Sequence, residues 1–185
     1  MNQKVVVITG ASSGIGAELA QQLGKQEHPV VLAARREAEL KAVARESGGQ
    51  ALPVVCDVTK KGEVERLMET ALKTFGRIDV WVNNAGRGIS RAVLELTDED
   101  VDEMVAVNLK SALYGMQVII PYFQQRGEGH LINVSSFLGR VPLASIRSVY
   151  SAAKAALNSL TANLRMDLAR TYPGIKVSLV MPGVV

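Results

Sequence analysis

Short apolar runs alternate along this chain with longer segments in which apolar residues recur every three or four positions. The first run, KVVVIT at residues 4–9, is followed by apolar residues at helical spacing. The runs are continuous rather than alternating, which is typical of strands buried on both faces. We therefore predict six strands, at residues 4–9, 30–34, 51–58, 79–83, 130–135 and 176–181.

The segments between these strands have the pattern of helices. The clearest apolar stripe covers residues 64–75, with spacings of three and four. A longer pattern predicts a helix over residues 98–122, with Thr97 as its N-cap and Asp100 three residues beyond the cap. A further helix is predicted over residues 149–171, before a proline and a glycine that end it.

The alternation of strands and helices predicts one class of fold. Each strand–helix–strand repeat implies a right-handed crossover between parallel strands. We therefore predict an α/β fold of the Rossmann type, a doubly wound parallel sheet with strand order 3-2-1-4-5-6 and helices on both faces. Residues 1–185 fit a single domain, and no linker or internal repeat divides them.

Composition and charge narrow the class of protein. Hydrophobic residues make up 48% of the chain and charged residues 21%, as in an ordinary globular domain. The net charge of +3 comes without any long basic run, so a nucleic-acid partner is not expected. No apolar run has the length of about 20 residues that a membrane helix needs, so no membrane partner is expected. A single cysteine and no room for a signal peptide before the first strand indicate a cytoplasmic protein.

The stretch GASSG at residues 10–14 matches the nucleophile elbow of serine hydrolases, G-x-S-x-G. A serine nucleophile needs a base nearby. The two histidines, His28 and His130, stand at the starts of predicted strands, roughly 17–20 Å from Ser12 at a strand's end. The hydrolase interpretation is therefore disfavoured, and so is a metal site, because the histidines are far apart and Cys56 lies in an apolar run.

The same stretch, extended to TGASSGIG, also fits a turn that binds a dinucleotide. Gly10 would permit the tight turn, Gly14 the approach of a pyrophosphate, and Gly16 close packing of the helix on the sheet. The free N–H groups at the start of the helix favour phosphate charge. In this interpretation the hydroxyls of Ser12 and Ser13 bond phosphate and are not nucleophiles.

Polar or glycine features follow all six predicted strands. Because the carboxyl ends of parallel strands meet at one edge of a doubly wound sheet, these features predict a ligand site there. They are the glycine loop, Arg35 and Arg36, Asp57, the sequence NNAG at residues 83–86, Ser135 with Ser136, and Pro182 with Gly183.

Tyr150 and Lys154 stand four residues apart at the start of a predicted helix, so they share one face. A free tyrosine exchanges protons poorly at neutral pH because its pKa is near 10. A lysine ammonium beside it stabilises the phenolate form, and the helix N-terminus acts in the same direction. The pair therefore predicts a tyrosine acid/base.

Taken together, TGASSGIG, NNAG, Asn108 in VAVNL, INVSS, YSAAK and the final PG resemble the short-chain dehydrogenase/reductase family, in order from Val5 to Gly183. The resemblance implies an oxidoreductase that transfers a hydride between a nicotinamide and a small carbonyl or alcohol substrate. It implies that Tyr150 exchanges a proton with the substrate oxygen. Lys154 would bind the nicotinamide ribose, and Ser136 would bond the substrate oxygen. Asn108 would hold a water in a proton relay with Lys154.

The family pattern places the catalytic serine second in Ser-Ser, so it favours Ser136 over Ser135. The spacing from Ser136 to Tyr150 is one residue longer than is usual in the family, which leaves Ser135 as the alternative. Predicted cofactor-binding residues are Gly10, Ser12, Ser13, Gly14, Ile15, Gly16, Arg35, Arg36, Asp57, Val58, Asn84, Ala85, Gly86, Tyr150, Lys154, Pro182 and Gly183.

The end of the second strand predicts the form of the cofactor. Ala34 stands where NAD-preferring members carry an aspartate, and Arg35 follows it. An acidic residue would bond the ribose 2′-hydroxyl, whereas a guanidinium suits a 2′-phosphate. We therefore predict NADP(H).

The resemblance also bears on assembly and on substrate. Compared with the family, residues 1–185 lack the C-terminal substrate loop, a further helix and a last strand, so the individual substrate is not predicted. Family members often form homodimers or homotetramers through the last two long helices, and the same is expected here. The alternative from another class is a non-catalytic dinucleotide-binding protein, such as a redox sensor or scaffold, which would keep the glycines without needing Tyr150.

Overall fold

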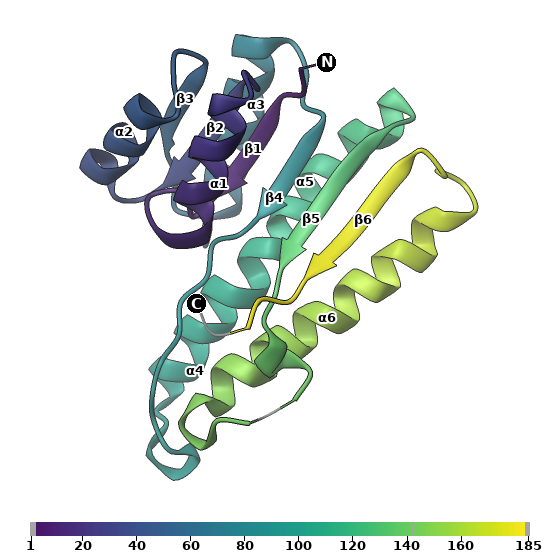
Figure 1. Cartoon of the computed structure of the whole chain (residues 1–185). Helices are drawn as coiled ribbons and strands as arrows, with labels where there is room; N and C mark the ends of the chain where they lie inside the picture. The colour runs from purple at the N-terminus through teal and green to yellow at the C-terminus, as the bar shows by residue number, and fades with distance from the viewer. Residues whose placement is uncertain (1–2, 142, 184–185) are drawn as a thin grey trace.

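Six short strands form one parallel sheet (Figure 1). The computed structural model describes residues 3–141 and 143–183. The strand order is β3-β2-β1-β4-β5-β6, which confirms the predicted fold class and order. The strands are β1 (Val6–Thr9), β2 (Val30–Ala34), β3 (Ala51–Val55), β4 (Val80–Asn83), β5 (Gly129–Val134) and β6 (Ile175–Val180).

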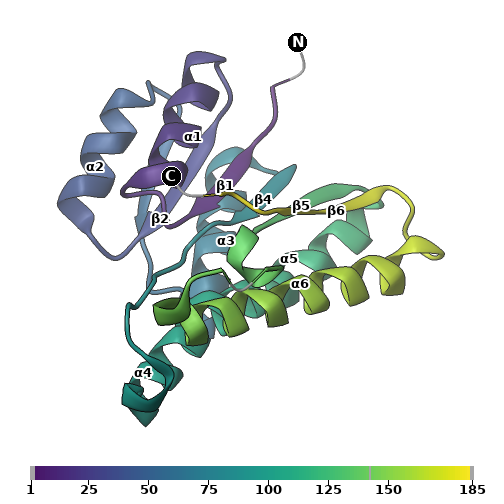
Figure 2. The same ribbon diagram turned by 60° about the horizontal axis from the view of Figure 1, so that its bottom comes forward.

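Helices cover both faces of the sheet, as Figure 2 shows. Helices α1 and α2 lie on one face, and α3, α5 and α6 lie on the other. The helices are α1 (Gly14–Lys25), α2 (Glu37–Glu46), α3 (Lys61–Phe75), α4 (Asp98–Val105), α5 (Ser111–Arg126) and α6 (Ser148–Ala169), with short helical turns η1 (Val93–Glu95), η3 (Phe137–Gly139) and η4 (Ser145–Arg147).

The helix predicted over residues 98–122 is longer and less regular than its sequence pattern indicated. It runs through α4 and α5 to Arg126, joined by a π-helical segment, η2 (Ala106–Lys110). Its predicted start is confirmed by a capping box. The Thr97 hydroxyl accepts a bond from the Asp100 amide at 3.3 Å, and the Asp100 carboxylate accepts one from the Thr97 amide at 3.0 Å.

The third strand is shorter than predicted, ending at Val55 instead of residue 58. Beyond it the Asp57 amide donates to the Glu63 carboxylate at 2.7 Å, and the Asp57 carboxylate accepts bonds from the amide and hydroxyl of Thr59. These side-chain bonds turn the chain towards α3, so the last residues of the apolar run form a loop.

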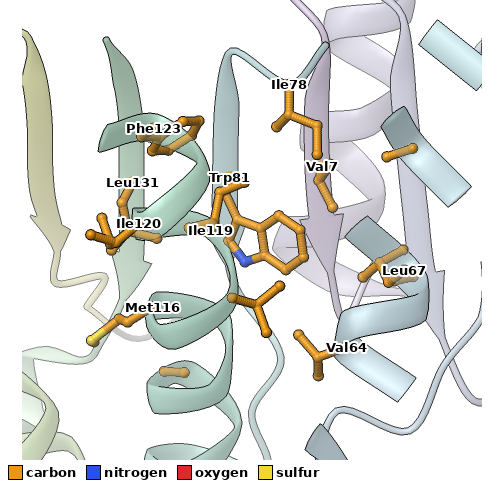
Figure 3. Close-up of a cluster of buried hydrophobic side chains, with 14 of the residues drawn as sticks. Val7, Val64, Leu67, Ile78, Trp81, Met116, Ile119, Ile120, Phe123 and Leu131 are labelled. Atoms are coloured by element: carbon orange, nitrogen blue, oxygen red, sulfur yellow. The ribbon is translucent and has the colours of Figure 1, made fainter. Parts of the chain in front are cut away.

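Side chains of alternate strand residues pack into two apolar layers, one on each face of the sheet. Val6 and Ile8 pack with the α1–α2 layer, while Val7 packs with α3 and α5. Figure 3 shows the Trp81 indole in the second layer, among side chains that include Leu67 and Ile119. Every residue of β1 and β2 is buried, which explains their continuous apolar sequences.

Among the described residues, one helical stretch, Asp98–Arg126, is long enough to cross a membrane and contains an 18-residue window with a mean hydropathy of 1.2. In the fold, 56% of its most apolar window is buried inside the protein. Phe123 and Ile119, for example, are fully buried in the layer beneath the sheet. The apolar character of this stretch therefore serves the core.

Candidate active site

A cavity of about 600 Å³ lies along the carboxyl edge of the sheet. Its position is the one expected for a ligand of a doubly wound sheet. Residues from the ends of all six strands line it, together with Val107 and Lys154 from the helices beneath. The strand-end residues are Gly10, Ser12, Ser13, Gly14 and Ile15; Ala34, Arg35 and Arg36; Cys56, Asp57, Val58 and Thr59; Asn84, Ala85, Gly86 and Arg87; Val134, Ser135 and Ser136; and Pro182 and Gly183.

The glycine loop joins β1 to α1 in a conformation that other residues rarely adopt. Gly10 and Gly14 have φ values of +66° and +57°. A Cβ on Gly16 would lie 2.6 Å from the Gly10 carbonyl oxygen and 2.5 Å from the Asn84 amide nitrogen. Gly16 therefore brings the helix close against the turn, and it lies behind the cavity wall instead of lining it.

Arg36 connects the end of β2 to the glycine loop. Its Nη2 atom donates to Ser12 Oγ at 3.0 Å and to Ser13 Oγ at 2.7 Å. Arg35 is also exposed on the cavity wall. Arg35 and Arg36 thus both line one end of the cavity, and both predicted loop serines bond the Arg36 guanidinium.

The neighbouring strand end holds one carboxylate in a fixed position. Burial acts to raise the pKa of Asp57, but the hydrogen bonds from Thr59 and the positive charges of Arg35 and Lys60 together outweigh it and hold that pKa below its ordinary value. Asp57 and Val58 both line the cavity. Beside them, burial and the Glu63 and Asp57 charges raise the pKa of Cys56 to about 11, so this thiol is no nucleophile at neutral pH.

The chain that leaves β4 is fastened to β1. The Thr9 hydroxyl accepts bonds from the amides of Asn84 and Ala85, and the Asn84 side chain donates to the carbonyls of Thr9 and Gly10. These bonds set Gly86 at the back of the cavity. A Cβ on Gly86 would lie 3.0 Å from Asn108 Oδ1 and 3.3 Å from Lys154 Nζ, so a glycine there permits the three to meet.

Asn108 is buried at the π-helical segment between α4 and α5. Its Oδ1 accepts from the Arg87 amide at 3.1 Å, and its Nδ2 donates to the carbonyls of Arg87 and Met104. These partners satisfy the amide that the sequence placed between Val107 and Leu109. Asn108 lies behind Gly86 and does not line the cavity.

Lys154 is a buried lysine on α6, with 3% of its surface exposed. Its Nζ donates to the Val134 carbonyl at 3.0 Å and lies 5.8 Å from the centre of the Tyr150 ring. Burial lowers the pKa of Lys154 to about 8. The half-buried Tyr150 does not line the cavity itself but stands beside its Lys154 wall.

The two serines after β5 are buried in different surroundings. The Ser135 hydroxyl donates to Asn158 Oδ1 at 2.5 Å and approaches the Lys154 carbonyl at 3.3 Å. The Ser136 hydroxyl accepts a bond from the Leu138 amide at 3.2 Å, which leaves its own proton free to donate. Both serines line the cavity, and the structure gives them different hydrogen-bonding capacity.

Neither histidine stands near the glycine loop. His28 precedes β2, where it accepts a bond from the Lys4 amide, and His130 is the second residue of β5, in contact with the Ser178 hydroxyl. Both therefore lie at the amino ends of strands, opposite the edge that carries Ser12. The hydroxyl of Ser12 bonds Arg36 instead of a base.

The sequence matches the family model for short chain dehydrogenases over residues 4–185. The chain belongs to the short-chain dehydrogenase family. A relative in that family, an uncharacterized oxidoreductase from Staphylococcus epidermidis, is 38% identical over 185 residues, which cover 100% of this chain and 79% of that protein. The protein is thus an oxidoreductase by family.

Solved short-chain dehydrogenases have the same fold. One from Burkholderia phymatum in complex with NAD superposes with a TM-score of 0.94 at 31% identity, over 100% of this chain and 66% of that one. The F189W actinorhodin polyketide ketoreductase with NADPH superposes with a TM-score of 0.92 at 37% identity, over 99% and 71%. Members similar to this chain therefore bind either form of the nicotinamide cofactor.

Three residues that shape this short-chain dehydrogenase site were not predicted from the sequence. Thr9 fastens the β4 loop, Thr59 fixes Asp57, and Asn158 Nδ2 donates to the Gly139 carbonyl and so connects α6 to the loop after β5. A signal was present for two of them. Asn158 follows Lys154 by four residues on the same helix face, and Asp-x-Thr is a common turn pattern.

Proposed function

We propose that this short-chain dehydrogenase binds NADP(H) along the carboxyl edge and catalyses reversible reduction of a small carbonyl compound, with Tyr150 as the acid/base. The observation that carries the proposal is the buried Lys154 ammonium. It stands over the Tyr150 ring and lines the cavity that Ser136 also lines. A buried ammonium beside a tyrosine is the arrangement needed to make a phenol exchange protons near neutral pH.

The residues present fit a dinucleotide. The cavity has the volume typical of a cofactor site, and the glycine loop offers backbone N–H groups at the start of α1. No atom of the described residues lies within 4 Å of where a Cβ on Gly14 would be, so a pyrophosphate has room there. Asp57 and Val58 would hold the adenine, and Pro182 and Gly183 would border the nicotinamide.

The choice of NADP(H) rests on the charges at the end of β2. Arg35 and Arg36 line the cavity, and the position where NAD-preferring members carry aspartate is the buried Ala34. A guanidinium binds a phosphate by charge-assisted hydrogen bonds, whereas a carboxylate there would repel it. The bond of Arg36 to the loop serines holds its guanidinium at the mouth of the cavity before a ligand arrives.

A nicotinamide held between Lys154 and the residues Pro182 and Gly183 would supply or take the hydride. In carbonyl reduction the Tyr150 hydroxyl donates its proton to the substrate oxygen, and Lys154 stabilises the phenolate that remains. Ser136 donates a hydrogen bond from its free hydroxyl to the same oxygen, keeps its proton, and so stabilises the negative charge that develops there. A proton from solvent would return to Tyr150 through Lys154 and a water that Asn108 holds. Alcohol oxidation is the reverse.

Loss of the Tyr150 hydroxyl tests the proposed chemistry. Purified full-length protein should oxidise NADPH in the presence of a panel of ketones, and Tyr150→Phe should lower kcat by roughly 100-fold or more because the proton donor is gone. Binding of NADPH, followed by its fluorescence, should remain within about threefold. Tight NADPH binding by the wild type with no turnover of any carbonyl or alcohol would favour the redox-sensor alternative.

Substitutions at the end of β2 test the choice of cofactor. Arg35→Asp should raise the KM for NADPH far more than that for NADH, by about tenfold or more, since a charge-assisted bond to the phosphate is replaced by repulsion. Arg36→Ala should act in the same direction and also release the loop serines. Arg45→Ala, on the exposed side of α2 away from the cavity, is the control. Equal changes in both KM values would contradict the assignment.

A homodimeric or homotetrameric state and a cytoplasmic location stay predictions. The exposed Ala152, Ser159 and Met166 on α6 leave a face on which a second copy could pack.

A further inference from the structure

A chain of buried polar side chains crosses the core directly beneath the proposed site. Trp81 Nε1 donates to Asn83 Oδ1 at 2.8 Å, and Asn83 Nδ2 donates to Asn133 Oδ1 at 2.9 Å. Asn133 Nδ2 then donates to Thr161 Oγ1 at 2.9 Å, and this hydroxyl donates to the Leu157 carbonyl at 2.7 Å. The exposed fraction is 5% for Asn83 and 0% for Trp81, Asn133 and Thr161.

Every bond in this polar chain has the same direction. The indole N–H can only donate and the Leu157 carbonyl can only accept, so the orientation of each side chain between them is determined. Bonds that follow one another in a low-dielectric interior polarise each other and strengthen. The second donor of Asn83 also has a partner, the Ala112 carbonyl on α5, at 3.1 Å. The polar chain is thus satisfied at each link and tolerates few alternative packings.

The polar chain connects the segments that carry the proposed catalytic groups. Asn83 is followed by the loop that holds Gly86, and Asn133 is followed by Val134, whose carbonyl accepts from Lys154. Asn83 and Asn133 are register partners in the β4–β5 pair. Thr161 stands on α6, seven residues and two helical turns beyond Lys154. One set of bonds therefore fixes the position of α6 along its axis relative to the ends of β4 and β5.

The backbone around this polar chain leaves room for it. A Cβ on Gly115 of α5 would lie 2.1 Å from Asn83 Oδ1 and 2.8 Å from Trp81 Nε1. The glycine thus lets α5 approach the side chains closely. Two apolar side chains in place of Asn133 and Thr161 would bury an equal area. They would have no directional bonds to stop α6 from sliding along the sheet.

We propose that Asn133 and Thr161 are positioning residues that hold Lys154 at the Val134 carbonyl and, with it, Tyr150 opposite Ser136. This inference rests on the proposed function, since it assigns these residues a part in the proton transfer. It predicts that loss of the Thr161 link slows turnover much more than it weakens cofactor binding, because the glycine loop and the two arginines of the cavity lie at the ends of β1 and β2, away from the polar chain.

Thr161→Val tests the proposal, because it preserves shape and removes both hydrogen-bonding capacities of the hydroxyl. We expect kcat for ketone reduction to fall by about tenfold, with the KM for NADPH unchanged within about twofold. Thr161→Ser, which keeps the hydroxyl, should restore kcat. Ser47→Ala is the matched control: Ser47, at the C-cap of α2, is also a buried hydroxyl that donates to the carbonyl four residues earlier, but it lies on the other face of the sheet.

A second measurement does not depend on turnover. The titration of Lys154, followed by NMR of the lysine side-chain carbons, should shift towards the ordinary lysine range in Thr161→Val and stay at the wild-type value in Thr161→Ser and Ser47→Ala. Asn133→Leu, which breaks the polar chain at its centre, should reproduce the Thr161→Val result if it folds.

A wild type that reduces no carbonyl would refute the proposed function, while the titration would still test the positioning. Wild-type kcat and an unshifted Lys154 titration in Thr161→Val, with only a lowered melting temperature, would overturn this inference.

Discussion

At the scale of single residues, the candidate site combines one buried positive charge with one exposed positive charge. The Lys154 ammonium is buried between the Val134 carbonyl and the Tyr150 ring, while the guanidinium of Arg36 stays exposed on the loop serines. The buried charge loses hydration and so has a lowered pKa, whereas the exposed one keeps its hydration. The two ends of the cavity therefore suit different tasks, proton exchange at one and binding of a phosphate at the other.

The lowered pKa of Lys154 predicts how stability changes with pH. Below the folded-state pKa of about 8, the lysine is protonated in both states and the fold bears the cost of a buried charge. Between about 8 and the ordinary value of 10.5, the unfolded chain binds more protons than the folded one, so stability rises with pH.

Lys154→Met should remove this dependence. We expect the variant to gain stability relative to the wild type at pH 7, and the relative gain to shrink by about 1–3 kcal/mol as pH rises towards 10.5. Urea unfolding of both proteins across that range measures the difference, from which other titrating groups cancel. A difference that does not change with pH would contradict the assignment.

At the scale of elements, short connections hold the loop after β4 in place. Arg91 forms an ion pair with Asp100, which also closes the capping box of α4, and the Arg91 amide donates to the Ile146 carbonyl at 2.9 Å. The start of α4 is therefore linked to both loops that approach the proposed catalytic residues.

Thr97→Ala should loosen that start. Loss of the cap oxygen leaves the Asp100 amide without its partner and should cost about 1 kcal/mol of unfolding free energy. Chemical denaturation measures the loss, and Thr97→Ser, which retains an oxygen, should lose much less. If Thr97→Ala and Thr97→Ser were equally stable, the cap would have no energetic role.

At the scale of the whole molecule, two apolar layers pack against the two faces of the sheet. Leu67 on α3 is fully buried beneath the sheet, whereas Leu94 is 98% exposed. The same substitution at the two positions therefore separates the contribution of the core from that of the surface.

Leu67→Ala should destabilise the fold by about 2–5 kcal/mol, because it removes buried apolar surface and leaves a cavity. Leu94→Ala should change the free energy of unfolding by less than about 0.5 kcal/mol. Thermal or urea unfolding measures both. Similar losses in the two variants would show that α3 packs less tightly than the structure has it.

The sequence predicted strand order, fold class and the cap at Thr97 correctly, because these follow from periodicity and local chemistry. It failed at the end of β3, where Asp57 bonds Thr59 and Glu63 bonds back to the Asp57 amide. The pattern of apolar residues does not predict such side-chain hydrogen bonds. The π-helical segment around Asn108 was also beyond prediction, since a single wide turn hardly alters a helical pattern.

What the sequence by itself determined was the family, the parallel sheet and the edge at which polar residues gather, since each depends on residue order. The tertiary structure decided which side chains meet, which the order of residues along the chain does not show. Arg36 bonds the glycine loop, and Asn133 bonds Thr161. Ser135 and Ser136 differ in the hydrogen bonds that they can still make. The bonds of Arg36 to Ser13, of Ser135 to Asn158 and of Asn133 to Thr161 join residues 23 to 28 positions apart in the sequence. Only the packing of α6 and the strand ends determines which contacts form.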